Sequence, residues 1–270
     1  SGRPFDQRQY NAPRYIRHMQ LGAVTYNVLK DMDLETVILT LEKTGYTCVE
    51  LRTTHKHGVE PSLSAAEREA VKARFARSKV KLLSFGTTCE FQSPDPEERR
   101  RQIDTAKQFI RLAHDTDAVA VKVRPNGLPN GVPRDTTIAA IADGLREVGQ
   151  YGYVHGVEVW LEVHGRETQT PPLAAAIMRA TKHDNVGLCW NSNPTDVADG
   201  SVKQSFALLR PWLKSCHINE LVSGYPYREL FSLMKSSNYD RWTLCECAES
   251  KEPERFLRYY RALWTELQRG

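Results

Sequence analysis

The chain has 270 residues, of which 40% are hydrophobic and 26% are charged, and its formal net charge at pH 7 is +4. This balance is typical of a globular protein, excludes a disordered or fibrous chain and gives no indication of a nucleic-acid partner. No apolar stretch approaches the roughly 20 residues that a membrane-spanning helix needs, so we expect no membrane partner. The chain begins Ser-Gly without a methionine. We expect a cytoplasmic protein, or an exported one if a signal peptide preceded Ser1.

Residues 1–17 come first in chain order and are rich in Arg and Tyr, with Pro4 and Pro13 among them. We expect this segment to form a short N-terminal arm that lies on the rest of the protein or on a neighbouring subunit. The second arrangement would make the protein a homo-oligomer.

Eight short runs rich in β-branched, aromatic and other apolar residues follow the arm. Runs of this length and composition predict strands. The predicted strands cover residues 19–26, 46–52, 80–86, 118–124, 157–163, 186–191, 214–220 and 242–247.

Each predicted strand is followed by a segment whose apolar residues recur at helical spacing. Gly45 stands where a helix C-terminus favours glycine, and Ser64 with Glu67 three residues later has the pattern of a capping box. The predicted helices cover residues 34–45, 64–78, 95–115, 136–152, 172–181, 201–212, 227–237 and 252–267.

Eight strand–helix units without a shift in composition predict an α/β protein with a single closed (β/α)8 TIM barrel over residues 18–270. An open doubly wound sheet is the alternative fold. It is disfavoured because the stretch GAVTYNVLKD at the first strand has only Gly22 where that fold carries a glycine-rich phosphate loop. The six cysteines fall mostly inside apolar runs, which predicts buried free thiols rather than a disulfide framework.

Polar residues occupy equivalent places at the ends of the last four predicted strands: Glu162, Asn191, His217 and Glu246. The carboxyl ends of the strands form the active face of this fold. The apolar residues that alternate with Glu162 suit packing under the helices, so Glu162 is expected to face the barrel axis. Two carboxylates, an amide oxygen and an imidazole form a ligand set suited to Mn²⁺, with Mg²⁺, Co²⁺ or Zn²⁺ as alternatives.

The motifs WLEVHG, NVGLCWN, SCHINEL and LCECAES stand at these four strands, in this order. In their order and spacing the chain resembles the xylose isomerase-like TIM barrel superfamily, in particular the sugar phosphate isomerase/epimerase group, over nearly all of residues 19–268. The resemblance implies one divalent metal held by Glu162, Asn191, His217 and Glu246. It also implies that the two glutamates remove and return a proton beside a carbonyl.

The chain departs from the family pattern at Asn191, where the family usually has Asp. The ligand set would then carry one negative charge fewer, so we expect weaker metal binding or a different ion. If Asn191 does not bind the metal, the site is vestigial and the protein is a non-catalytic sugar-binding barrel.

Residues near the four strand ends are further candidates for substrate binding. His164 stands where it would meet a substrate hydroxyl, and Lys122 would polarise a substrate oxygen or neutralise nearby carboxylates. Glu50 and Arg52 end the second predicted strand, where pairing with each other is the preferred alternative to a catalytic role. His55 and His57 would line the pocket or bind an additional metal, and Trp190 and Tyr225 would stack on a sugar ring or pack in the core.

The sequence therefore predicts a metal-dependent isomerase or epimerase that acts on a small sugar or keto-sugar through an enediolate, with Glu162 and Glu246 as the acid/base pair. A lyase or hydratase acting on a 3-keto sugar is the alternative enzyme, because it begins with the same proton abstraction. No loop has a clear phosphate cradle, which favours an unphosphorylated substrate. An apurinic endonuclease is disfavoured because SNPTD and INELVSGYPY, which follow Asn191 and His217, lack the histidines for further metal ions.

Overall fold

The computed structural model describes residues 19–269, and the predicted arm at residues 1–17 lies outside this range. Within it, eight parallel strands pair in chain order and close into a barrel, because β1 also pairs with β8. The predicted TIM barrel is thus confirmed. The strands are β1 (Gln20–Val24), β2 (Cys48–Arg52), β3 (Lys81–Gly86), β4 (Ala120–Val123), β5 (Glu158–Glu162), β6 (Val186–Trp190), β7 (Leu213–Ile218) and β8 (Trp242–Cys245).

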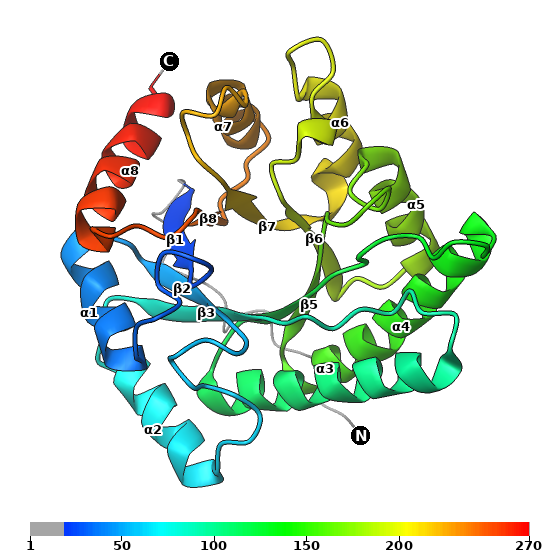
Figure 1. The fold of residues 1–270 in the computed structure, drawn as a ribbon, viewed down its shortest axis with the longest axis horizontal. Coiled ribbons are helices and arrows are strands. Elements are labelled where there is room, and N and C mark those ends of the chain that lie inside the picture. The colour runs from blue at the N-terminus through cyan, green and yellow to red at the C-terminus, as the bar shows by residue number, and fades with distance from the viewer. Residues whose placement is uncertain (1–18, 270) are drawn as a thin grey trace.

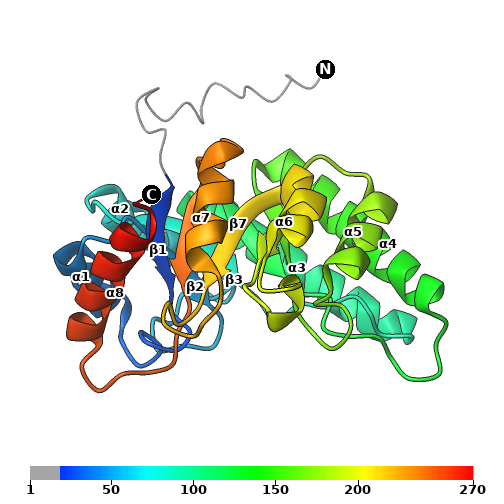
Figure 2. The same ribbon diagram turned by 90° about the horizontal axis from the view of Figure 1, so that it is seen from above.

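The helices form a ring around the strands, as Figure 1 shows down the shortest axis of the molecule. Figure 2, turned by 90°, shows helices on either side of the strands. Each strand of the described chain is followed by one α-helix of this ring. They are α1 (Leu34–Thr44), α2 (Ala65–Ala76), α3 (Pro96–Thr116), α4 (Arg134–His155), α5 (Pro171–Thr181), α6 (Lys203–Leu209), α7 (Tyr227–Ser236) and α8 (Pro253–Leu267).

Two predicted helix ends are confirmed in detail. Gly45 ends α1 in the left-handed conformation with φ 80°, which glycine adopts without strain. Ser64 accepts a hydrogen bond from the backbone N–H of Glu67, and the Glu67 side chain accepts one from the N–H of Ser64.

Two other predicted helices differ from the structure. Helix α4 continues past Gly152 to His155, and Gly156 caps it in the left-handed conformation with φ 69°. Gly152 is a close-packing position and not a helix end: a Cβ there would lie 2.4 Å from the Val157 carbonyl oxygen. The segment predicted as one helix over 201–212 is α6 followed by a 3-10 turn over Arg210–Trp212. Pro211 lacks the N–H that a continuing α-helix needs.

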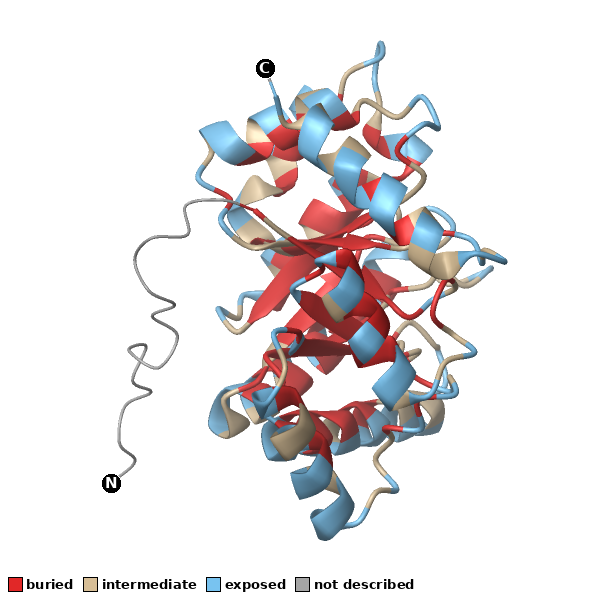
Figure 3. Cartoon of the chain, turned by 90° about the vertical axis from the view of Figure 1, so that its left-hand side faces the viewer, coloured by how far each residue is buried: buried red, intermediate tan, exposed pale blue. Residues whose placement is uncertain are grey.

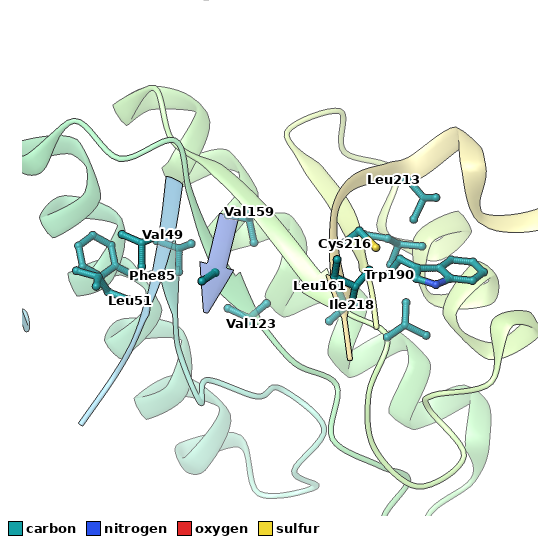
Figure 4. Packing of buried hydrophobic residues seen from close by; sticks show 14 of the residues in the cluster. Val49, Leu51, Phe85, Val123, Val159, Leu161, Trp190, Leu213, Cys216 and Ile218 are labelled. Atoms are coloured by element: carbon teal, nitrogen blue, oxygen red, sulfur yellow. The ribbon is translucent and has the colours of Figure 1, made fainter. Parts of the chain in front are cut away.

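The core has two layers, and Figure 3 shows the buried residues concentrated in the strands and on the inner faces of the helices. The larger layer lies between strands and helices and includes Val159 and Leu161, which are labelled with their neighbours in Figure 4. The smaller layer lies inside the barrel and includes Trp160, Cys189 and Leu244. Because Trp160 and Leu244 point inward, alternation turns Glu162 and Glu246 inward as well, as predicted.

All six cysteines are buried and free, which confirms the prediction from their apolar surroundings. None of the helices within residues 19–269 is long and apolar enough to cross a membrane.

Candidate active site

Three side chains from β2, β7 and the end of β8 form one half of the site. The ring of His217 lies between two carboxylates: its Nε2 is 3.0 Å from Glu50 Oε1, and its Nδ1 is 3.2 Å from Glu246 Oε2. Ser84, which pairs with Glu50 in the β2–β3 register, donates a hydrogen bond of 2.7 Å to Glu50 Oε2. Glu50 and His217 are completely buried. Glu50 therefore fixes the orientation of the imidazole.

The second half of the site comes from the neighbouring strands β4 and β5. The Lys122 ammonium donates a hydrogen bond to Glu162 Oε2 and forms an ion pair with it. Both residues are buried, with relative exposures of 7% and 5%. A buried carboxylate is costly without a compensating cation, and here the chain itself supplies that cation.

Burial and the neighbouring charges act in opposite directions on the acids of the site. Burial alone would raise the pKa of Glu162, but Lys122 and then His217 outweigh it and lower this pKa to about 2. Burial also opposes ionisation of Glu50, yet His217 holds its pKa below the usual value. For Glu246 burial prevails and raises the pKa. The pKa values of Glu162 and Glu246, the two predicted acid/base residues, are thus shifted in opposite directions. Such a difference is typical of sites in which one carboxyl group acts as the base and the other as the acid.

Asn191 Oδ1 is buried beside these carboxylates without a hydrogen-bond partner, and His217 Nδ1 makes no hydrogen bond but lies 3.2 Å from Glu246 Oε2. The Asn191 amide group is held from its other end, because Nδ2 donates to Asn193 Oδ1 at 3.1 Å. Buried polar atoms without a partner are rare and indicate an absent ligand, ion or water. An amide oxygen and an imidazole nitrogen, with Glu246 Oε2 near the latter, are suitable ligands for a divalent metal.

The four predicted metal ligands are therefore in unequal states. Asn191 Oδ1 has no hydrogen-bond partner, His217 and Glu246 lie against each other, and Glu162 is bound by Lys122. Within residues 19–269, no group of three or more His, Cys, Asp or Glu side chains is placed to hold a metal ion. The four side chains therefore have the chemistry of metal ligands but are engaged differently in this structure.

His164 lies at the rim above Glu162, as its position two residues further along the chain predicts. It is partly buried, its Nδ1 has no hydrogen-bond partner, and burial lowers its pKa. The next residue, Gly165, has φ 94°, and a Cβ at this position would lie 2.6 Å from the Cα of Asn126 in the loop after β4. The loops that follow Lys122 and Glu162 are thus in close backbone contact.

The expected pairing of Glu50 with Arg52 is wrong, because Glu50 is bound to His217 and Ser84. Arg52 Nη1 instead donates to the carbonyl oxygen of Thr53 and to Thr54 Oγ1. These bonds turn Arg52 toward the loop after β2.

Arg52 also lies 5.7 Å from the centre of the Tyr26 ring, which stacks on His55 at 6.2 Å. His55 Nδ1 is 2.8 Å from Thr25 Oγ1, and burial lowers the pKa of His55 to about 4, so this ring is neutral at pH 7. Tyr26 is 43% exposed. It follows β1 on the inward-facing side and was not singled out by the sequence analysis, although strand alternation could have identified it.

His57 has a structural role that leaves neither ring nitrogen for a substrate or a metal. Nδ1 accepts a hydrogen bond from the backbone N–H of Val59, so Nε2 donates to the carbonyl oxygen of Arg52 at 2.7 Å. The expectation that His57 lines the pocket is therefore wrong. The residue closes the loop that follows β2.

Trp190 and Tyr225 also lie outside the site. Because Cys189 faces the barrel interior, the next residue, Trp190, faces the helices, and Figure 4 shows its ring projecting away from the strands. The ring packs against Phe206, and its Nε1 donates to the Tyr225 hydroxyl, which donates to Asp196 Oδ2 at 2.7 Å. Of the two roles considered for this pair, packing is the one that the structure shows.

Comparison with known proteins agrees with the fold and with the motifs. Residues 38–263 match the protein family described as xylose isomerase-like TIM barrel, which is most of the chain. No curated protein matches the chain in sequence.

Several solved structures share the barrel over nearly their whole length. A D-psicose 3-epimerase from Clostridium cellulolyticum H10, solved with D-tagatose, has a TM-score of 0.80 at 14% identity, covering 93% of this chain and 100% of that one. A 3-keto-D-glucoside 4-epimerase from E. coli has a TM-score of 0.78 at 14% identity, with coverages of 92% and 99%. The IOLI protein, solved with a bound zinc atom, has a TM-score of 0.72 at 17% identity, with coverages of 92% and 96%. At such identities the likeness shows a common fold.

Proposed function

The chain belongs to the xylose isomerase-like TIM barrel family, and on this premise we propose that it is an isomerase or epimerase of a small sugar or keto-sugar. The observation that carries the proposal is the pair Glu162 and Glu246. These carboxyl groups reach the barrel mouth from β5 and β8, which β6 and β7 separate, and their pKa values are shifted in opposite directions, downward by Lys122 for Glu162 and upward by burial for Glu246.

Glu162 is the proposed base that removes the proton beside the substrate carbonyl. The contact with Lys122 keeps this carboxyl ionised at neutral pH, so it is ready to accept a proton. Glu246 is the proposed acid, since burial favours its protonated form. Return of a proton from Glu246 to the opposite face gives an epimer, and return to the neighbouring carbon gives an isomer.

The imidazole and the ammonium group position and stabilise the reacting atoms. Glu50 holds the ring of His217 so that Nδ1 faces Glu246. Lys122 and His164 are the proposed donors to substrate oxygens, because both border Glu162. A donor aimed at the oxygen of an enediolate stabilises its developing charge.

We further propose that a divalent ion binds Asn191, His217, Glu246 and, after Lys122 moves away, Glu162. Mn²⁺ is the preferred ion, with Mg²⁺, Co²⁺ or Zn²⁺ as alternatives. When bound, such an ion polarises the carbonyl and lowers the energy of the enediolate. The zinc atom in the structurally similar IOLI protein supports this part of the proposal.

The substrate class rests on the same site and on the structural neighbours. Two of the similar structures are epimerases of a free ketose and of a 3-keto-glucoside. A lyase or hydratase acting on a 3-keto sugar is the second candidate, because elimination begins with the same proton removal and a probable 3-DHS dehydratase shares the fold with a TM-score of 0.71.

Exchange of substrate hydrogen with solvent deuterium tests the proposed roles. In a panel of aldo, keto and 3-keto sugars with Mn²⁺ present, the natural chain should incorporate deuterium beside the carbonyl of at least one. Glu162→Gln and Glu246→Gln should each slow turnover of that sugar by ~10²–10⁴-fold, the usual contribution of a general acid or base.

Glu158→Gln is the matched control, because Glu158 lies on the same inward face of β5 but binds Arg241 and Trp160 instead. It should exchange at the natural rate. Undiminished exchange in Glu162→Gln or Glu246→Gln removes that residue from the mechanism, and no exchange with any sugar rejects the proposed function.

A further inference from the structure

The contact between Lys122 and Glu162 joins a buried cation to one of the four proposed metal ligands. Lys122 lies inside the barrel near three acids, and Glu162, Glu50 and Glu246, in that order, stabilise its charge. Among residues 19–269, Glu162 is the one that binds its ammonium group directly. The position of Lys122 is therefore set by Glu162.

Lys122 binds Glu162 through Oε2, and the second carboxylate oxygen could still approach a metal. A divalent ion there would lie close to the buried ammonium group, however, and two like charges at so short a distance in a buried site repel each other strongly. Glu162 also cannot remain without a cation, because it is almost completely buried. Two cations can thus satisfy the same carboxylate, and one of them belongs to the chain. The lysine side chain is flexible enough to move between partners, since four methylene groups carry its charge.

We propose that the Lys122 ammonium and a divalent metal ion compete for Glu162, so that Lys122 sets the metal affinity of the site. This inference rests on the proposed metal ligands. Lys122 compensates Glu162 when no metal is bound, so folding of the barrel does not depend on the ion. When the metal takes Glu162, the released ammonium is still attracted by Glu50 and Glu246, whose charges act on it as well.

The Asn191 oxygen nearby supports competition rather than permanent replacement of the metal. Lys122 binds Glu162 but leaves Asn191 Oδ1 without a hydrogen-bond partner, and His217 Nδ1 faces Glu246 Oε2 at 3.2 Å instead of Lys122. An ammonium group that had taken over the whole role of the ion would bind the Asn191 oxygen as well. The site thus keeps metal-binding atoms that its own cation does not use.

Binding of Mn²⁺ to the purified, metal-stripped chain, measured by calorimetry or by electron paramagnetic resonance without substrate, tests the proposal. Lys122→Met keeps an apolar stem of similar length and removes the charge. It should bind Mn²⁺ at least tenfold more tightly than the natural chain, and Mn²⁺ should raise its Tm by more. Lys122→Gln, which retains a donor for Glu162, should show a smaller gain and serves if the Met variant does not fold.

Lys81→Met is the matched control, because Lys81 is an exposed strand lysine on β3. Its affinity for Mn²⁺ should equal that of the natural chain. The proposal is overturned if the Lys122 variants bind Mn²⁺ with unchanged or lower affinity, or if neither they nor the natural chain bind it. Deuterium exchange by the metal-stripped natural chain, measured separately, tells whether the proposed function survives that outcome.

Discussion

The barrel mouth and the loop after β6 both bury carboxyl groups, and the two surroundings shift the pKa of Glu50 and of Asp196 in opposite directions. Glu50 in the mouth and Asp196 in the loop are 0% and 1% exposed. Beside Glu50 stands the imidazole of His217, and the pKa of Glu50 lies below its usual value although burial opposes this. Asp196 receives hydrogen bonds from the Asn193 backbone N–H and from the Tyr225 hydroxyl, but it forms no ion pair with a cation of residues 19–269, and burial raises its pKa to about 7.

The difference shows that neighbouring charge, more than burial, separates a reactive site from a structural network in this molecule. The mouth combines three acids with Lys122 and His217, so each acid there has a basic group nearby with which it can form an ion pair. The loop contains only neutral donors around Asp196, and its hydrogen bonds anchor Trp190 and Tyr225. Both places look alike in sequence, as polar residues after a strand.

The largest expected effect comes from breaking the charge pairing in the mouth. Glu50→Gln leaves His217 without its fully buried anionic partner, and loss of one partner of a buried pair costs roughly 3–5 kcal/mol. Urea denaturation at pH 7 measures the difference in the free energy of unfolding.

Glu158→Gln is the comparison variant, because the pair that it breaks with Arg241 is partly exposed, with side-chain exposures of 29% and 23%. The loss in the free energy of unfolding should be about 1 kcal/mol in this variant. Equal losses of unfolding free energy in Glu50→Gln and Glu158→Gln would contradict the prediction that the buried pair contributes more than the partly exposed one.

A smaller effect, dependent on pH, is expected in the loop. The folded state raises the pKa of Asp196 from 3.8 to about 7, so it binds the proton more tightly than the unfolded state does. The resulting stabilisation is complete below a pH of about 4 and is lost as the pH rises to about 7. Asp196→Asn has no charge to bury, so its stability relative to the natural chain should increase by roughly 2–4 kcal/mol across this range. Denaturation curves at pH 4, 5.5 and 7.5 give the free energy of unfolding of both proteins. The prediction is wrong if the difference between the two free energies is the same at all three pH values.

The smallest effect should follow from Tyr225→Phe. The change removes one hydrogen bond to Asp196 and one acceptor for the Trp190 indole, at a cost of about 1–2 kcal/mol. Because this network lies on the helix-facing side of the barrel, the rate of sugar turnover should stay at the natural value. A lower rate with unchanged stability would place Tyr225 in the site after all.

The sequence was sufficient for the fold because the barrel repeats one local unit. Alternating apolar residues marked the strands, and helix caps such as Gly45 and Ser64 marked helix ends. The inward direction of Glu162 followed from the same alternation, as did that of Glu246. Applied to β6, this rule would also have turned Trp190 away from the mouth, since it follows the inward-facing Cys189.

The partners inside the mouth were not predictable in this way. Glu50 and His217 are separated by 167 residues and meet only because the barrel closes. The contact between Lys122 and Glu162 depends on the register of two neighbouring strands, which the sequence does not state. The sequence made His57 a candidate metal ligand, but it could not show that both ring nitrogens form hydrogen bonds with the backbone.

The close approach of Gly165 to Asn126 has a consequence for redesign of the protein. Because no side chain fits between the two loops, neither loop can be exchanged alone for one from another barrel without displacing its neighbour. Directed evolution of the proposed substrate specificity should therefore diversify both segments in the same library, as a single cassette.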